Sequence, residues 1–334
     1  MGLLFLISCV ASGKGLTPPA IVPDVKPEEK FVFYSNRYAV CYLSESSTSE
    51  KLAERYLGKP GKAWAIEEIN GSKTFGAGEV VVIPLQEENP GGITEEGYQT
   101  IPVLCYNRFA LECKKPRCVE IDEFEQQAGY LAENGYHVIT LRELEGFLYY
   151  RSSLPEKTVV LTVDGGHESA YEIAYPILKS MGLTATFLVC PEFVGTGPDF
   201  LTWEQLKEMK DNGFEIGVHS LFRCDLSQAQ KGENEDVFRE RILGEFKDAK
   251  SALDERLGQD TVSLAYPYGE NSPAIMDVCR SAGYRLAVTI QPGANPFFAD
   301  PLALKREHIQ GKDPRPFEEK LKVFEESLLA TGKE

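Results

Sequence analysis

The stretch LTVDGGHESAY, residues 161–171, decides the fold. It continues a run of apolar residues that does not alternate with polar ones, and this run ends at Asp164. Two glycines follow, and then apolar residues recur at helical spacing, among them Ala170, Ile173 and Ile177. An unalternating strand that leads into an amphipathic helix indicates a parallel sheet whose two faces are covered by helices.

The same strand–helix pattern recurs from residue 101 onward. The predicted strands read IPVLCY, HVIT, TVVLTV, TATFLV, EIGVH, VSLAYP and RLAVTI. Helical segments are predicted at residues 122–135, 171–182, 202–213, 234–257 and 273–283. Four of them end at a glycine, the residue most common just past a helix C-terminus: Gly135, Gly182, Gly213 and Gly283. We therefore predict an α/β fold with the sheet closed into a barrel.

In parallel barrels the side chains that perform chemistry lie at the carboxyl ends of the strands. This rule places Asp164, His219 and the segment Tyr266–Tyr268 on one rim. The two tyrosines are predicted to line a sugar-binding wall; alternatively, Tyr-Pro-Tyr-Gly is only a turn that ends a strand.

Charge excludes some partners. The chain has 334 residues and a net charge of −16, with no basic cluster. Nucleic acid is therefore not expected as a partner, and neither is direct adsorption to an anionic membrane.

The amino terminus predicts export. Its apolar run is too short to cross a bilayer. The segment Leu6-Ile7-Ser8-Cys9 resembles a lipobox, which implies cleavage before Cys9 and a lipid anchor on it, although no Lys or Arg precedes the run. The alternatives are the remnant of an ordinary signal peptide (residues 1–9) or a first buried strand. Residues 10–30 are Pro-rich and predict a linker, so we expect an anchored lipoprotein or a periplasmic or extracellular protein.

The eight cysteines include no Cys-x-x-Cys pair, which argues against a thiolate zinc site. Cys113 and Cys118 flank an apparent loop and can form a disulfide in an exported protein. Most of the others lie in apolar contexts typical of buried thiols.

Residues 31–86 predict a small unit with the order strand–helix–helix–strand. The residues Tyr38, Val40, Asn70 and the segment Gly78–Pro84 give this unit a resemblance to LysM modules. The resemblance implies binding of N-acetylglucosamine-containing glycans, but SESSTS replaces the usual Gly-Asp-Thr-Leu turn. The alternative is a structural spacer. Residues 87–100 are turn-rich and predict a linker to a domain at 101–334.

Residues 101–310 resemble the NodB-homology polysaccharide deacetylases. The resemblance is carried by IPVLCYNRF, IDEFEQQAGYLAENGYHVITLREL, LTVDGGHESAYEIAYPILKSMGLTATFLV, GFEIGVHSLFRCDLS, AYPYGE and SAGYRLAVTI. It implies a distorted (β/α) barrel that removes acetyl groups from N-acetylglucosamine residues. It also implies a divalent metal, usually zinc, held by one Asp and two His.

The sequence departs from that pattern at the metal. By the resemblance, Asp164 takes the place of the general base and His219 that of a retained ligand. Gly165 stands where the ligand Asp belongs, Arg223 where the second His belongs, and Asn107 replaces another usual His. Two of three ligands are missing, so no cofactor is expected, or zinc or another divalent metal if the site is rebuilt. We hypothesise that Arg223 takes the electrostatic place of the metal, with Gly165 leaving space for it or for a ligand oxygen.

Three further residues are candidates. His167 could swing in as a ligand, His308 could act as general acid, and Arg306 could pair with and orient Asp164. The alternative for each is a surface or capping side chain.

The free energies involved favour a loss of deacetylase activity. A metal lowers the pKa of bound water from about 15.7 to about 7, which is on the order of 12 kcal/mol. An oriented general base supplies roughly 3–5 kcal/mol. We therefore expect a glycan-binding protein on a deacetylase scaffold, with N-acetylglucosamine polysaccharide or peptidoglycan as partner, Asp164 and Arg306 as catalytic-site residues, and Asn107, Arg223, Tyr266 and Tyr268 in contact with the glycan. The alternatives are an active N-deacetylase with a rebuilt site and a structural partner in an envelope polysaccharide machine.

Overall fold

The computed structural model describes residues 30–35, 37–85, 89–94, 96–114, 117–219, 230, 232–311, 313 and 315–326. Cys9 and the Pro-rich segment predicted as a linker lie outside these residues. The chain divides into two compact units, Met1–Gln86 and Glu87–Glu334. In the described part, no helix is both long and apolar enough to span a membrane.

The first unit is a three-stranded antiparallel sheet with two helices. The sheet has the order β1 (Lys30–Tyr34), β2 (Tyr38–Tyr42), β5 (Val80–Pro84). Helices α1 (Ser49–Leu57) and α2 (Ala63–Asn70) lie between β2 and β5 in the chain, joined by the short η1 (Pro60–Lys62), and β3 (Ser47–Thr48) pairs with β4 (Thr74–Phe75).

Asn70 ties the second helix of this unit to its sheet. Its amide donates to the carbonyls of Ile66 and Val82, both at 2.7 Å, and its side-chain oxygen accepts from the Val82 N–H at 2.9 Å. The predicted order strand–helix–helix–strand is present, with β1 and the β3–β4 pair added. The LysM-like assignment stays a prediction.

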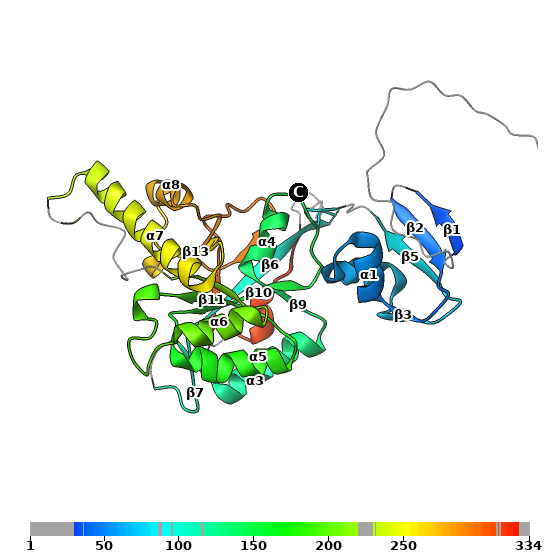
Figure 1. Cartoon of the computed structure of the whole chain (residues 1–334), viewed down its shortest axis with the longest axis horizontal. Helices are drawn as coiled ribbons and strands as arrows, with labels where there is room; N and C mark the ends of the chain where they lie inside the picture. The colour runs from blue at the N-terminus through cyan, green and yellow to red at the C-terminus, as the bar shows by residue number, and fades with distance from the viewer. Residues whose placement is uncertain are drawn as a thin grey trace, which may run out of the picture. The chain divides into compact units, whose positions relative to one another are not determined.

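The second unit contains a curled parallel sheet (Figure 1). Its strands follow the order β14 (Leu286–Val288), β13 (Ser263–Ala265), β12 (Glu215–Val218), β11 (Thr186–Val189), β10 (Thr158–Asp164), β6 (Gly97–Tyr106), and β9 (His137–Ile139) pairs with the start of β10. All these pairings are parallel. The seven predicted strands are confirmed, and the α/β fold with them.

A short segment late in the chain joins the two edges of this sheet. Leu304 forms a parallel bridge with Val288 of β14, and β16 (Glu307–His308) pairs in parallel with β6. Two further strands, β15 (Ala294–Pro296) and β17 (Phe324–Glu326), pair antiparallel with β6. The sequence did not predict these three strands, but together with the closing bridge they give the barrel-like curvature that it did predict.

Helices cover the sheet. They are α3 (Ile121–Glu133), α4 (Leu141–Leu148), the π-helical turn η2 (Ala170–Ala174) continued by α5 (Tyr175–Ser180), α6 (Trp203–Asp211), α7 (Glu235–Leu257) and α8 (Pro273–Ser281). All four glycines predicted to end helices have positive φ, between 68° and 91°. Helices α4 and α6 begin with capping boxes, on Thr140 and Thr202. Helix α4 was not predicted.

The cysteines behave as expected where they are described. Cys113 and Cys118 form a disulfide, which joins the first residue of β8 (Cys118–Glu120) to the loop after β7 (Arg108–Ala110). Free thiols of Cys41, Cys105, Cys190 and Cys279 are buried.

Candidate active site

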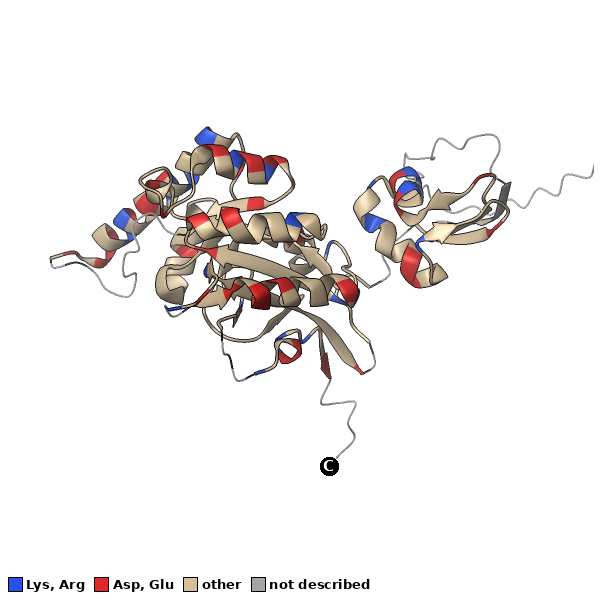
Figure 2. Ribbon diagram, turned by 90° about the horizontal axis from the view of Figure 1, so that it is seen from below, with Lys and Arg blue, Asp and Glu red and all other residues tan. Residues whose placement is uncertain are grey.

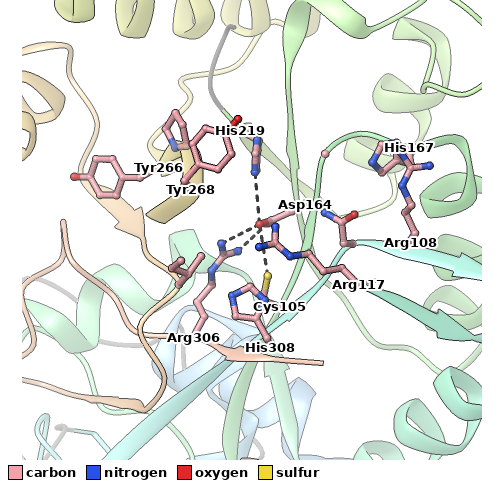
Figure 3. Close-up of a pocket in the computed structure, with 14 residues that line it drawn as sticks. Cys105, Arg108, Arg117, Asp164, His167, His219, Tyr266, Tyr268, Arg306 and His308 are labelled. Carbon is pink, nitrogen blue, oxygen red and sulfur yellow. Dashed lines mark hydrogen bonds and ion pairs between the residues drawn. The ribbon is translucent and has the colours of Figure 1, made fainter. Parts of the chain in front are cut away.

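A cavity of about 240 Å³ opens at the carboxyl ends of the parallel strands. Asp164 is the last residue of β10, His219 follows β12, and Tyr266 follows β13. The described residues that line the cavity are Cys105, Asn107, Arg108, Arg117, Asp164, Gly165, His167, His219, Tyr266, Pro267, Tyr268, Ile290, Arg306 and His308 (Figure 3). The strand-end rule therefore brought the described candidate residues to one place. Arg223 lies outside the described residues, and its proposed role stays a prediction.

Asp164 is held in a buried ion pair with Arg306. Guanidinium Nη1 donates to Oδ1 at 2.7 Å and Nη2 to Oδ2 at 2.9 Å, and both side chains are almost fully buried. Arg306 is itself fixed, because its Nε donates to the Thr289 carbonyl at 2.8 Å. The Cys105 thiol lies 3.5 Å from Oδ2 and donates to it. The pairing anticipated for Arg306 is present, and it leaves the carboxylate in a fixed orientation.

This pairing decides the charge of Asp164. Burial alone would raise the pKa of its carboxyl group, but the charges of Arg306 and His219 and the hydrogen bonds from Arg306 and Cys105 outweigh burial and hold that pKa below 3.8. The charge of Asp164 correspondingly raises the pKa of Arg306 against the effect of its burial. Asp164 is therefore a carboxylate at neutral pH.

Two histidines flank the pair. His219 Nε2 lies 3.7 Å from Asp164 Oδ2, and the His219 backbone N–H donates to the Val189 carbonyl at 2.7 Å. Burial, followed by the charge of Arg306, lowers the pKa of His308 below 6.5. His308 is therefore a neutral imidazole at neutral pH, able to accept one proton.

Position 165 explains the missing carboxylate next to Asp164. Gly165 has a φ of 101°, a region that only glycine enters readily. A Cβ added there would lie 3.0 Å from His167 Nε2 and 3.2 Å from its Cδ2. Gly165 lines the cavity, and the imidazole of His167 lies against one side of it. The expectation that Gly165 leaves space for Arg223 or for a ligand oxygen stays a prediction. His167 is buried and packs against Phe200 with ring centroids 5.6 Å apart.

The donor set does not fit a divalent metal. Within the described ranges, no three His, Cys, Asp or Glu side chains lie close enough together to hold one. Both oxygens of Asp164 already accept from a guanidinium, and position 165 offers no ligand. Stable protein sites for zinc use three or four donors. No catalytic step at this site is therefore assigned to a metal.

The two tyrosines differ in exposure. Tyr266 is 1% exposed, and its hydroxyl donates to the Leu302 carbonyl at 2.9 Å. The ring of Tyr266 packs in the core, so little of this residue reaches the cavity that it helps to line. Its contact with glycan stays a prediction. Tyr268 is 60% exposed and has a left-handed backbone, with φ of 55°. Such a backbone is an outlier for a bulky residue and is typical of functional sites.

Sequence reasoning missed four lining residues: Cys105, Arg108, Arg117 and Ile290. Arg108 lies two residues past the end of β6, so the strand-end rule could have found it. No pattern in the sequence indicated Arg117, because the pairing of β7 with β8 is what brings this residue to the cavity.

Acid is expected to destabilise the second unit in two steps. The folded-state pKa of His308 lies below 6.5. His308 therefore binds a proton near pH 6.5 in the unfolded chain, but only at lower pH in the folded chain. Stability from this group is present above pH 6.5 and is lost as pH falls towards the folded-state pKa. Asp164 adds a second loss below 3.8, since its pKa is also lowered. Urea unfolding at several values between about pH 5 and pH 8 should show the first step. In the variant His308→Gln, the free energy of unfolding should depend less on pH in this range. An unchanged pH dependence would contradict the assignment of the first step to His308.

Comparison with known proteins agrees with the fold. Residues 151–287 match the family described as polysaccharide deacetylase. YxkH of Bacillus subtilis, a candidate polysaccharide deacetylase, is 28% identical over 209 residues, 63% of this chain and 71% of that protein. A poly-beta-1,6-N-acetyl-D-glucosamine N-deacetylase of Staphylococcus aureus is 27% identical over 194 residues, 54% of this chain and 65% of that protein, slightly under two thirds of its length.

Among solved structures, the deacetylase PplD of Streptococcus pyogenes, in complex with acetate, superposes with a TM-score of 0.61 at 29% identity, covering 68% of this chain and 98% of that one. The second unit, with its curled α/β sheet and strand-end cavity, has the polysaccharide deacetylase fold and contains a region similar to that family. Its matched region is residues 151–287, within the longer range that the motifs indicated.

Proposed function

We propose that this chain binds N-acetylglucosamine-containing glycan at the strand-end cavity without hydrolysing it by metal-dependent deacetylation. One observation carries the proposal: at position 165 a glycine replaces the expected ligand, and the His167 imidazole occupies the space beside it. The neighbouring carboxylate, Asp164, remains buried and oriented by Arg306. The described part of the site retains groups that can hold an acetamide, and it contains no cluster of ligands for a metal that would activate water.

The proposed location is the cell envelope. The lipobox-like segment at Cys9 and the Pro-rich segment after it support export with a lipid anchor. The Cys113–Cys118 disulfide supports it independently, since disulfides persist mainly in oxidising compartments. The first unit, with its LysM-like order of elements, would add a second contact with the same class of glycan.

Acetate release tests the catalytic half of the proposal. The protein would be incubated with N-acetylglucosamine oligomers in the presence of zinc, cobalt or chelator, beside the variant Asp164→Asn. We expect no release above the buffer control in any condition. Metal-dependent release that Asp164→Asn abolishes would favour the alternative, an active deacetylase with a rebuilt site.

A variant of Tyr268 tests the proposed glycan binding. Tyr268→Gly removes the exposed ring and suits the left-handed backbone, which costs a non-glycine residue about 1–2 kcal/mol. We expect the variant to be at least as stable as the parent, and to bind the oligomers about 3- to 10-fold more weakly, the worth of one aromatic contact. Calorimetric titration measures the affinity. Tyr268→Phe is the matched control and should bind like the parent; equal affinity of the glycine variant would remove Tyr268 from the site.

A further inference from the structure

We propose that the Cys113–Cys118 disulfide positions Arg117 at the cavity, so that a dithiol reductant converts the cavity to a state that binds glycan more weakly. The inference rests on the proposed glycan binding and adds its regulation. The disulfide joins the connection between β7 and β8 to the first residue of β8. Arg117, the residue just before that cysteine, lines the cavity. The disulfide and the cavity lining are therefore neighbours in the chain.

The connection between β7 and β8 is short for the way these strands pair. The two strands are parallel, with Arg108 opposite Cys118. A parallel pair usually needs a connection of about a dozen residues or more, because the chain must return to the end from which it started. Here residues 111–117 alone make this return. Such a connection restricts its residues to few backbone conformations.

Backbone strain lies at the end of this connection. Arg117 has a left-handed backbone, with φ of 58°, which is unfavourable for a residue with a Cβ and persists where the surrounding structure enforces it. The Arg117 carbonyl accepts from the Arg108 N–H at 3.3 Å. The next carbonyl, that of Cys118, accepts from the Gly311 N–H at 2.9 Å. The disulfide adds a covalent restraint to these hydrogen bonds, and it is the restraint that a reductant removes.

The strands on either side do not depend on the disulfide. Phe109 of β7 and Val119 of β8 are 3% and 0% exposed and belong to the core. The ring of Phe109 packs against that of Phe124 with centroids 4.6 Å apart. These apolar contacts are the same whether the cysteines are oxidised or reduced. Loss of the disulfide is therefore expected to loosen the connection and Arg117, and to leave the fold intact.

The disulfide is accessible to a dithiol from one side. Cys113 is partly exposed and Cys118 is buried, so a thiolate of the reductant would attack the Cys113 sulfur. The S–S bond breaks, and its electron pair leaves with the Cys118 sulfur, which then takes up a proton. The second thiol of the reductant displaces Cys113 as a thiol and closes the reductant's own disulfide. Two electrons thereby pass from the dithiol to the protein.

The charge of the connection favours this exchange. The residues between the two cysteines read KKPR, whereas the chain has a net charge of −16 and its helices carry many acidic side chains (Figure 2). Positive neighbours stabilise a thiolate, and a more stable thiolate is a better leaving group. The basic segment therefore makes this disulfide easier to reduce than the same bond in an acidic surrounding.

Release of Arg117 would change the cavity directly. Its side chain extends towards Asp164 and His308 (Figure 3). A guanidinium offers five N–H donors, which suit the hydroxyl and acetamide oxygens of a sugar. A side chain held in place before the ligand arrives loses little entropy on binding. After reduction the ligand itself would have to order Arg117, which lowers the affinity.

Calorimetric titration of the full chain with a neutral N-acetylglucosamine oligomer, with and without dithiothreitol, tests the inference. Reduction should weaken binding by about 10-fold, the worth of one hydrogen bond to a charged group. The double variant Cys113→Ser with Cys118→Ser should bind as weakly as the reduced parent, and the reductant should not change its affinity. Arg117→Asn suits the left-handed backbone and should also bind weakly in both conditions. Arg151→Asn removes the same charge outside the cavity lining and should respond to the reductant like the parent.

NMR titration of the His308 imidazole gives a readout that needs no ligand. Burial and the charge of Arg306 lower the pKa of His308. The charges of Arg117 and Lys320 lower it further, whereas that of Asp164 raises it. Release of Arg117 on reduction should therefore raise the pKa of His308, and Arg117→Asn should remove this response.

The outcomes separate the inference from the proposed function. Equal affinities with and without the reductant would overturn the inference and leave glycan binding intact. A response that persisted in Arg117→Asn would show that the disulfide acts through another part of the cavity, and would also overturn it. If no form bound the oligomer, the proposed function would fail and its regulation with it, while the pKa of His308 would still show whether the disulfide positions Arg117.

Discussion

Replacement of Arg306 by methionine is expected to lower the free energy of unfolding by about 3–5 kcal/mol, the usual cost of leaving a buried charge without its partner. The physical reason is the environment of Asp164, which is 5% exposed and accepts both of its shortest hydrogen bonds from Arg306. Without the guanidinium, burial would dominate and raise the pKa of the carboxyl group. Urea unfolding at neutral pH measures the loss.

A double variant is the matched control for this loss. Asp164→Leu combined with Arg306→Met removes both charges and retains most of the side-chain volume. Buried ion pairs replaced in this way often lose little stability, so the double variant should recover most of what Arg306→Met loses. If the single variant lost less than about 1 kcal/mol, the pair would behave like an exposed ion pair, and the buried geometry would be contradicted.

Replacement of Gly269 by alanine is expected to cost about 3–5 kcal/mol, the sum of backbone strain and overpacking. Gly269 has a φ of 78°, and a Cβ there would lie 2.4 Å from Ile290 Cγ1 and 2.7 Å from the Ile290 backbone nitrogen. The side chain could move, but the backbone that leaves β14 could not do so cheaply. Because Gly269 follows Tyr268 and Ile290 lines the cavity, glycan affinity should fall as well.

Gly213→Ala separates the two contributions to that cost. Gly213 has a similar φ of 87°, but a Cβ there meets nothing within 4 Å. This variant should lose only the strain, about 1–2 kcal/mol. Thermal or urea unfolding of both variants gives the difference. Equal losses would show that the contact with Ile290 is relieved by movement of the loop.

The strands of the large sheet were predictable because parallel strands are buried on both faces and read as continuous apolar runs. The segment 304–308 was not, since a two-residue strand has no periodicity to detect. Its partners, Val288 and Leu104, are defined only once the sheet curls. Helix α4 was missed for a similar reason, because eight residues give little more than two turns of pattern.

The candidate site likewise has features that the sequence predicts and features that only the folded chain defines. Asp164 ends β10, His219 follows β12 directly and Tyr268 lies three residues past β13, so their convergence could be predicted from the order of the elements. The burial of Tyr266 could not, because it depends on the Leu302 carbonyl, 36 residues later. The position of His167 beside Gly165 could not be predicted, since only the turn after β10 brings this imidazole back towards the glycine.

The ion pair between Asp164 and Arg306 also imposes an order of assembly on the chain. The two residues are 142 positions apart, and the segment that carries the arginine is the one that joins β14 to β6. During synthesis the aspartate emerges long before its counter-ion, while the sheet still has open edges, which are prone to pair with other chains. Docking of residues 304–308 closes those edges and neutralises the buried charge in one event. The domain therefore reaches its stable state only after residues 304–308 have been made.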